Sequence, residues 1–349
     1  MKKINVAVVG VGNFTRALME GVAFYTKNPE ETVGLMNPFI GAYQVKDIHF
    51  VAGFDVDERK VSKKLSEAVE MEPNVPMNIC KPLDYDAMVY RGPTLGSIVE
   101  PMKGRFVKES KEASINIAEV LKQNKVEVLV NLLPTGSDEA TYLYAEASLE
   151  AGCHFINCIP TPLATQASWV QRFEEKGLVL LGDDIKSQLG ATMLNRQILQ
   201  VMKMRGIKIE RSEQENKGGN TDHFNLLYRA TAKEKSKRTA LTEFLSQEDA
   251  RPVVKFTYTG IPSGHKEVQI HIEGRIFGNT PIKLFAKIED EISVNGAGVA
   301  VDAIRVAKLL GATKCVQARE TNAFLMKSPL KPMSDFEAFD AFEKIVSLC

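Results

Sequence analysis

Two glycines near the start of the chain, Gly10 and Gly12, stand where a dinucleotide could bind. They follow the unbroken apolar run of residues 4–9, which is typical of a buried parallel strand, and residues 17–22 resume with helical spacing. In such a turn the first glycine allows the bend, the second lets backbone N–H groups approach a pyrophosphate, and the helix N-terminus attracts the negative charge. The pattern predicts a nucleotide cofactor at this turn.

A carboxylate after the next predicted strand indicates which nucleotide. Asp55 follows the apolar residues 49–54, where it can accept hydrogen bonds from an adenosine ribose and disfavour a 2′-phosphate, so NAD is favoured over NADP. The full dinucleotide-binding motif has a third small residue three places after the second glycine, and here Thr15 stands at that place. Judged by itself, the turn is therefore explained equally well by glycines that provide only backbone freedom. The long separation of Gly12 from Asp55 predicts an insertion over residues 27–47.

Several lysines could stabilise anions. If their segment is helical, Lys233 and Lys237 lie on one face. Repulsion between these two like charges destabilises the helix by roughly 0.2–0.5 kcal/mol. A phosphate bound between them would make the arrangement favourable. A solvated basic face explains the same run, and Lys266 and Lys327 carry no signal singly.

Polar residues also follow three later strands. Residues 134–137 form a turn after one predicted strand, and Asn157 ends the next, where it could contact the cofactor or only form a turn. Asp183, Asp184 and Lys186 follow a third strand; the aspartates could orient a nicotinamide or substrate, or Asp184 or Ser187 could cap a helix.

The elements that must position these residues alternate between strand and helix. Helices are expected over residues 58–70, 109–124 and 138–151, and strands over 126–133, 154–157 and 178–181. The Pro-rich residues 71–104 form a long excursion, which we expect to fold over the cofactor. Strands over 207–214, 253–258, 267–277 and 282–289 then predict a separate antiparallel sheet with one solvated face.

The predicted fold class is α/β: a Rossmann-type, doubly wound parallel sheet with an inserted α+β antiparallel-sheet domain. Residues 1–206 are the expected nucleotide-binding domain, 207–290 the separate sheet domain, and 291–349 a segment that returns to the first domain.

Composition narrows the class of partner. The chain has 349 residues, with 44 Lys plus Arg and 44 Asp plus Glu, which argues against a broad nucleic-acid surface but allows one cationic pocket. No apolar run is long enough to cross a membrane and no secretory pattern is visible, so a soluble, cytoplasmic protein with a small-molecule substrate is expected. The five scattered cysteines are expected to be reduced.

Taken together, the chain resembles the myo-inositol-1-phosphate synthases of bacteria and archaea over nearly its whole length. The resemblance is carried by residues 9–13, 54–57, 91–95, 182–188, 218–222 and 325–329 and by the lysine cluster. It implies that residues 1–206 form an NAD-binding Rossmann domain, that residues 207–290 form a catalytic and tetramerisation domain, and that the protein is a homotetramer. A divalent metal is possible, because some members of the family use one, and no ligand cluster in the sequence decides the matter.

The resemblance also implies a reaction and its residues. D-glucose 6-phosphate is oxidised at C5, loses a C6 proton, closes its ring by attack of C6 on C1, and is reduced again at C5, giving 1L-myo-inositol 1-phosphate. The implied catalytic residues are Lys233, Lys237, Lys266, Lys327, Asp222 and Asp290. The implied cofactor-binding residues are Gly10, Gly12, Asn13, Phe14, Asp55, Pro134, Thr135, Asn157, Asp184, Lys186, Ser187 and Asn220.

Some assignments and two other functions stay open. The spacing after Asp222 is shorter than in some members of the family, so Lys235 could take the role given to Lys233. Lys186 and Ser187 could hold the substrate phosphate together with the polar glycine-containing turn of residues 216–222. The alternatives are an NAD-dependent dehydrogenase of another sugar or polyol phosphate, which would release NADH, and a non-catalytic NAD-binding protein.

Overall fold

The first of two sheets carries the dinucleotide-type topology. The computed structural model describes the backbone of residues 2–75, 78–242, 245, 249–313 and 318–347, and their side chains except those of 230–233, 235–240, 242, 313, 318 and 319. Six parallel strands lie in the order β3-β2-β1-β4-β5-β6. They are β1 (Ile4–Val9), β2 (Ile48–Asp55), β3 (Met88–Arg91), β4 (Val128–Asn131), β5 (His154–Asn157) and β6 (Leu180–Leu181). This order confirms the predicted Rossmann-type sheet.

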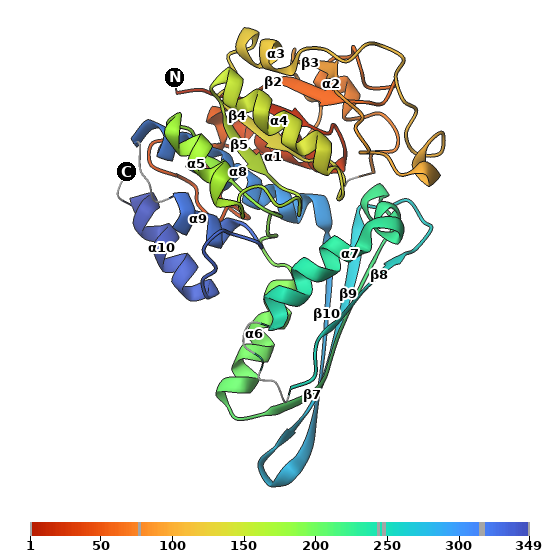
Figure 1. Ribbon diagram of the computed structural model, residues 1–349, viewed down its shortest axis with the longest axis vertical. Helices are drawn as coiled ribbons and strands as arrows, with labels where there is room; N and C mark the ends of the chain where they lie inside the picture. The colour runs from red at the N-terminus through yellow and green to blue at the C-terminus, as the bar shows by residue number, and fades with distance from the viewer. Residues whose placement is uncertain (1, 76–77, 243–244, 246–248, 314–317, 348–349) are drawn as a thin grey trace.

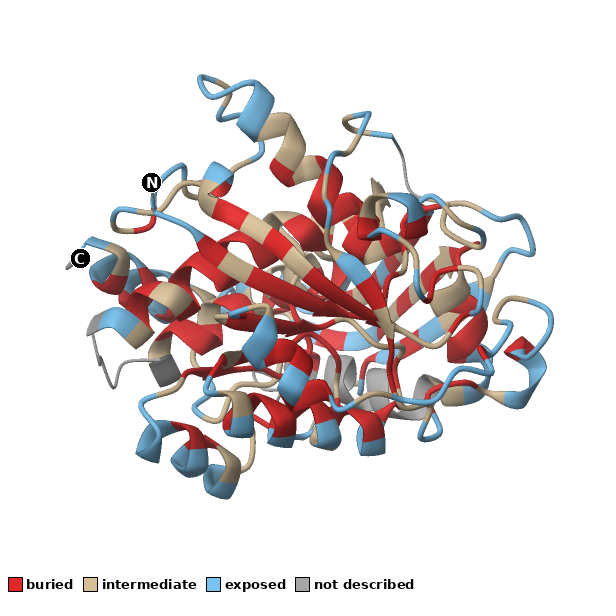
Figure 2. Ribbon diagram, turned by 90° about the horizontal axis from the view of Figure 1, so that it is seen from above, coloured by how far each residue is buried: buried red, intermediate tan, exposed pale blue. Residues whose placement is uncertain are grey.

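Helices cover both faces of this sheet (Figure 1), and the strands are largely buried between them (Figure 2). Successive residues of β1 serve opposite faces: Val6 and Val8 pack with one cluster of helices, Ala7 and Val9 with the other. The first cluster includes α1 (Asn13–Lys27), α2 (Leu65–Ala68), α8 (Ile292–Thr313), α9 (Ala318–Leu325) and α10 (Asp335–Ser347). The second includes α3 (Ile117–Gln123), α4 (Asp138–Ala151) and α5 (Ala167–Glu175).

The second sheet has four strands in the order β10-β9-β7-β8 and extends away from the first (Figure 1). They are β7 (Lys208–Gly218), β8 (Val253–Tyr258), β9 (His265–Ile276) and β10 (Thr280–Glu291). The sheet is mixed, because β8 pairs parallel with β7 while the other pairs are antiparallel. Helix α6 (Ala191–Met204) packs on it through Leu199 and Met202, although α6 lies before the expected boundary at residue 206. Helix α7 (Thr221–Thr242) lies beside β8.

Two expected helices are much shorter than predicted because their backbones bond to neighbouring segments. Of residues 58–70 only α2 is α-helical: Ser62 has a φ of 62°, its N–H donates to Val89, and the N–H of Leu65 donates to Ala87. Of residues 109–124 only α3 is helical, since the N–H of Ser110 donates to Val56.

Short 3₁₀ helices complete the connections: Val45–Asp47 in the expected insertion, Glu100–Met102 in the excursion, and Phe277–Asn279 between β9 and β10. The excursion over residues 71–104 also supplies β3, at one edge of the first sheet. Within the described residues, no helix combines the length and hydrophobicity that a membrane span requires.

Acidification is expected to destabilise the protein through His154, the first residue of β5. Its Nδ1 accepts the N–H of Val179 at 3.1 Å, and burial, with Lys308 nearby, lowers the pKa of His154 from 6.5 to about 4. Protonation therefore favours the unfolded chain. The neutral imidazole contributes fully to the free energy of unfolding above pH 6.5, and this contribution, up to about 3 kcal/mol, is lost as the pH falls toward 4. Urea unfolding at pH 7.5 and 4.5 measures the loss. His154→Asn, which keeps an acceptor for Val179, should show a smaller pH effect; an equal one contradicts the assignment.

Candidate active site

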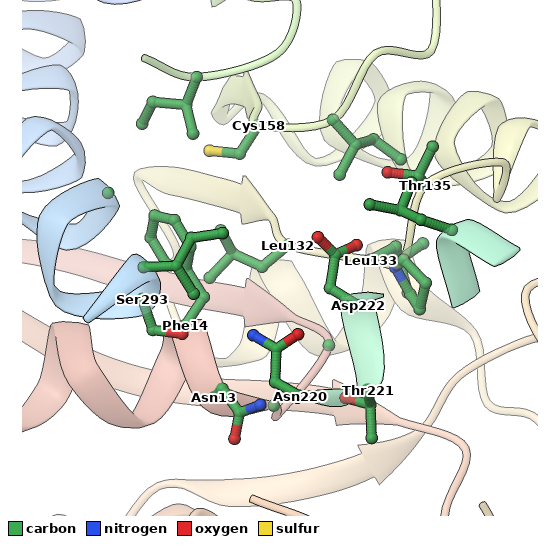
Figure 3. A pocket seen from close by; sticks show the side chains of 18 of the residues that line it. Asn13, Phe14, Leu132, Leu133, Thr135, Cys158, Asn220, Thr221, Asp222 and Ser293 are labelled. Atoms are coloured by element: carbon green, nitrogen blue, oxygen red, sulfur yellow. The ribbon is translucent and has the colours of Figure 1, made fainter. Parts of the chain in front are cut away.

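A cavity of about 320 Å³ lies at the carboxyl ends of the strands of the first sheet, against the second sheet. It brings together most of the residues that the sequence predicts, from both sheets and from the C-terminal segment. Those lining it are Gly10, Gly12, Asn13, Phe14, Asp55, Pro134, Thr135, Asp184, Lys186, Ser187, Asn220, Asp222, Lys266 and Lys327. Figure 3 shows Asn13, Asn220 and Asp222 around one space, although they come from two elements far apart in the sequence.

The glycine turn has the geometry that an anion-binding turn needs. Gly10 has a φ of 88°, and a Cβ there would lie 2.8 Å from the carbonyl oxygen of Leu132. A Cβ on Gly12 would meet no protein atom within 4 Å, so the backbone is open toward the cavity. Gly12 precedes α1 without a side-chain cap, and no acidic residue lies in the first turn, which leaves the positive helix end available to an anion.

Thr15, the departure from the glycine fingerprint, has a structural role. Its side chain is fully buried, and its Oγ1 donates to the carbonyl oxygen of Gly10 at 2.6 Å. The Thr15 hydroxyl thus holds the turn from the protein interior. The β-branched side chain of Thr15 is accommodated because it faces that interior rather than the cavity.

The Asp55 carboxylate lies at the tip of β2, and its partners fix its position. Oδ2 accepts the N–H of Val11 at 2.8 Å, and Oδ1 accepts those of Val56 and Asp57 at 2.7 and 2.9 Å. Oδ1 thus uses both of its lone pairs, whereas Oδ2 has a second lone pair for a further donor. The group is therefore held rigidly beside the glycine turn and can accept a hydrogen bond from a ribose hydroxyl.

Lys327 reaches the cavity from the C-terminal segment. Its Nζ donates to Oδ1 of Asp184 and to the carbonyl oxygen of Ile185, both at 2.7 Å. The backbone N–H of Lys327 donates to the carbonyl of Asp184 at 2.8 Å, and Ile185 forms a bridge with Met326. Both backbones thus hold the ammonium and the carboxylate at fixed positions, beside one end of the cavity.

A second charged group lies on the same side. Lys186 donates to Oδ1 of Asp335 at 3.1 Å, and Nε of Arg196 lies 3.5 Å from Oδ2 of the same residue. Burial lowers the pKa of Lys186, although Asp335 acts in the opposite direction. Burial acts to raise the pKa of Asp335, but the two cations outweigh it and lower that pKa. Two cations and one carboxylate give this end of the cavity a positive balance that suits a phosphate.

Two predicted polar residues hold the first sheet together. Asp183 accepts the backbone N–H groups of residues 163–165 at 2.9 to 3.1 Å, in the turn before α5, so its carboxylate holds that turn and does not cap a helix. Asn157 donates to Asp183 at 2.7 Å and accepts from Asn131 at 2.9 Å. Asn157 is fully buried and does not line the cavity, so it acts on the site only through its neighbours.

The second sheet brings further polar groups to the cavity. Asn220 caps the start of α7, where its Oδ1 accepts the N–H of His223 at 3.0 Å. Lys266 is buried on β9 and lies opposite Asp290 of β10. Asp290 does not line the cavity; its Oδ2 accepts from Asn295. Of this group, Asn220, Asp222 and Lys266 therefore reach the cavity directly, and Asp290 lies beside Lys266 on the neighbouring strand.

The lysines of α7 are placed only by their backbone. Lys233, Lys235 and Lys237 all lie in helix α7. Their segment is therefore helical, as a shared face for Lys233 and Lys237 requires. Their side chains lie outside the described residues, and their roles stay predictions.

The excursion forms one wall of the cavity, through residues that the sequence did not single out. Asn74, Ile98 and Met102 line it together with Lys60. The Nζ of Lys60 donates to the carbonyl of Val11 at 2.8 Å and to Asn74 at 3.1 Å, and burial lowers the pKa of Lys60. No spacing pattern distinguishes Lys60 from the other lysines of its polar segment.

A metal site is not assigned. Among the described side chains, no group of three or more His, Cys, Asp or Glu is arranged to hold a metal ion.

Comparison with known proteins places this geometry in context. The family model described as Myo-inositol-1-phosphate synthase matches residues 190–291. The chain is 40% identical to the inositol-3-phosphate synthase of Mycolicibacterium smegmatis, over 95% of each chain, and 36% identical to that of Corynebacterium glutamicum, over 98% of each. A myo-inositol-1-phosphate synthase-related protein from Thermotoga maritima has a similar structure, with a TM-score of 0.83, 25% identity, and coverage of 99% of this chain and 98% of its own.

Proposed function

This chain belongs to the inositol-3-phosphate synthase family, and from that premise we propose that it converts D-glucose 6-phosphate to 1L-myo-inositol 1-phosphate with NAD as a catalytic cofactor. The observation that carries the proposal is one cavity in which the glycine turn and Asp55 meet Lys186, Lys266 and Lys327. A dehydrogenase needs a nucleotide site and a base. Several ammonium groups around one sugar suit a reaction in which negative charge develops on different oxygens in turn.

The turn fits a dinucleotide. The open face at Gly12, the uncapped start of α1 and the rigid carboxylate of Asp55 would hold the pyrophosphate and the adenosine ribose. When bound, the nicotinamide supplies an acceptor for the C5 hydride and later returns it. Asn13, Phe14 and Thr135, which line the cavity, would border the cofactor.

The lysines would stabilise the sugar oxygens. The ammonium of Lys327, held by Asp184 and Ile185, would stabilise negative charge on the C5 or C1 oxygen. Lys266 is buried away from water, so its charge must be stabilised by partners in the protein or by a ligand in the cavity. Lys233 and Lys237 would complete the group, with Lys237 on the oxyanions and Lys233, or Lys235 in its place, near the nicotinamide or in proton transfer.

The substrate phosphate would lie beside Lys186 and Ser187. Helix α6 begins next to them after Gly190, with no side-chain cap and no acidic residue in its first turn, and Gly190, Ala191 and Thr192 line the cavity. Free N–H groups and a cation at one helix N-terminus form a phosphate site. Phosphate at this position would place the sugar between the glycine turn and Lys327.

The larger organisation is proposed on the same basis. Residues 1–206, 207–290 and 291–349 would form the cofactor domain, the catalytic and tetramerisation domain, and the returning segment of a cytoplasmic homotetramer.

Replacing Asp55 by Asn is expected to weaken the preference for NAD. The loss of one negative charge removes the repulsion toward a 2′-phosphate, and the amide oxygen keeps one of the two acceptor positions of the carboxylate, so the ratio of kcat/KM for NAD to that for NADP should fall at least about 10-fold. Steady-state kinetics with both cofactors measure the ratio. Glu58→Gln removes an exposed charge three residues later and should leave the ratio unchanged. An unchanged ratio in Asp55→Asn would exclude Asp55 from ribose recognition.

Product analysis tests the function itself. Purified protein, D-glucose 6-phosphate and NAD should yield an inositol monophosphate, detected by phosphorus NMR, with no rise in NADH absorbance. A rise in NADH together with an oxidised sugar phosphate would indicate the dehydrogenase alternative. Binding of NAD without turnover would indicate a non-catalytic protein.

A further inference from the structure

Helix α7 contains a bend that separates its cavity-lining half from its lysine-bearing half. Arg229, near the middle of the helix, has a non-helical backbone with φ −134° and ψ 23°. Thr221, Asp222 and Leu226 of the first half line the cavity, and Lys233 and Lys237 lie in the second half. The conformation at Arg229 therefore determines where the second half lies relative to the cavity.

The side chain of Arg229 extends away from α7 and donates hydrogen bonds to two loops that belong to the first sheet. Its Nη1 donates to the carbonyl oxygen of Gly136 at 2.9 Å and its Nη2 to that of Gly96 at 2.5 Å. The first loop follows β4 and the second belongs to the excursion. Both loops line the cavity, through Thr135 and Ser97 respectively. One planar guanidinium thus connects α7 to two cavity walls that do not adjoin in sequence.

Gly136 makes this contact possible. A Cβ on Gly136 would lie 2.6 Å from Cδ of Arg229 and 3.1 Å from its Nη1, so the arginine packs directly on the bare backbone. The first half of α7 has its own contact with the same loop, because Asn225 donates to the carbonyl of Thr135 at 3.0 Å. Loss of Arg229 would therefore leave the first half in place and release the bend.

We propose that Arg229 is a positioning residue that couples the two loops around the bound cofactor to the lysine-bearing half of α7. A nucleotide that orders residues 96–97 and 135–136 fixes their carbonyl oxygens, and these fix the guanidinium and the bend. The proposal rests on the proposed function for the catalytic value of Lys233 and Lys237, but the physical coupling between nucleotide and helix does not depend on turnover.

The test compares the wild type with Arg229→Ala and Gly136→Ala. Misplaced lysines should lower kcat about 100-fold in both variants, while KM for D-glucose 6-phosphate and the Kd for NAD change by less than about 3-fold. Millimolar guanidinium chloride should restore part of the activity of Arg229→Ala, in which its site is vacated, but none of that of Gly136→Ala. Gly152→Ala is the matched control: its φ of 76° gives a similar backbone cost, and its Cβ would meet nothing within 4 Å.

A second readout separates this inference from the function. In the wild type, NAD should slow amide hydrogen exchange in residues 230–242; in Arg229→Ala, NAD should bind but no longer slow it. If the wild type makes inositol phosphate and this protection is the same in both proteins, the coupling is wrong and the function stands. If the wild type makes no product and the protection is still lost in Arg229→Ala, the function is wrong and the coupling stands. A kcat for Arg229→Ala close to that of the wild type would also overturn the inference.

Discussion

Lys327→Ala is expected to lower kcat for inositol phosphate formation by about 10²- to 10³-fold at saturating NAD, the loss typical of removing one electrostatic donor from a buried site. The Nζ of Lys327 is held at 2.7 Å from both Asp184 and a backbone carbonyl, so its charge is already in position before the sugar arrives. Water entering the space left by the side chain would reorganise in each catalytic step and would stabilise an oxyanion less well. Single-turnover measurements of product, with NAD bound beforehand, give the chemical rate directly.

A nearby lysine provides the control for Lys327. Lys331 is paired with Glu320 at 3.2 Å but is exposed, so Lys331→Ala should keep kcat within about 2-fold. The Kd of Lys327→Ala for NAD should stay near that of the wild type, because the hydrogen bonds of this ammonium go to Asp184 and Ile185 and not to the glycine turn. Full activity in Lys327→Ala, with NAD still bound, would show that the reaction does not use this ammonium.

Gly12→Ala is expected to abolish most NAD binding without destabilising the protein in the absence of NAD. Gly12 has a φ of −101°, which alanine adopts readily, and the new Cβ would touch no protein atom within 4 Å. It would project into the space through which the pyrophosphate approaches the backbone. We expect the Kd for NAD to rise at least about 100-fold, equivalent to about 2.7 kcal/mol. Calorimetric titration measures the affinity, and thermal unfolding without NAD measures the stability.

Another glycine of α1 tests whether the effect belongs to the turn. A Cβ on Gly21 would also meet nothing within 4 Å, and Gly21 lies inside the helix, where alanine is the better helix former. Gly21→Ala should leave NAD affinity unchanged and raise the free energy of unfolding by about 0.5–1 kcal/mol. If Gly12→Ala binds NAD as tightly as Gly21→Ala does, the dinucleotide does not lie at this turn.

The periodicity of apolar residues within a segment predicts those helices and strands whose bounds do not depend on contacts with distant segments. The expected helix 138–151 and strands 154–157 and 253–258 have the observed bounds of α4, β5 and β8, because their apolar spacing and turn residues lie within the elements themselves. The expected helix 58–70 fails for the opposite reason. The backbone of residues 62–65 bonds to residues 87 and 89, more than twenty residues later, and no periodicity within the segment indicates that partner.

The candidate site divides in the same way. The glycine turn and Asp55 are predicted from residue type and spacing, since a strand end and a helix start define their position. Lys266 and Lys327 enter the prediction only through resemblance, and the cavity that joins them is assembled from two sheets and the C-terminal segment. Lys60 and Arg229 could not be predicted, because each acts through carbonyl oxygens of segments distant in sequence, which any residue provides.

The central claim is that one bound nicotinamide takes a hydride from C5 of the sugar and returns it to the same carbon within the cavity. D-glucose 6-phosphate labelled with deuterium at C5 tests this claim most directly, when the enzyme turns over in the presence of excess unlabelled NADH. The account predicts inositol phosphate that retains the deuterium, and a free NADH pool that acquires none. Deuterium in the free NADH, or inositol phosphate that has lost it, would contradict the account.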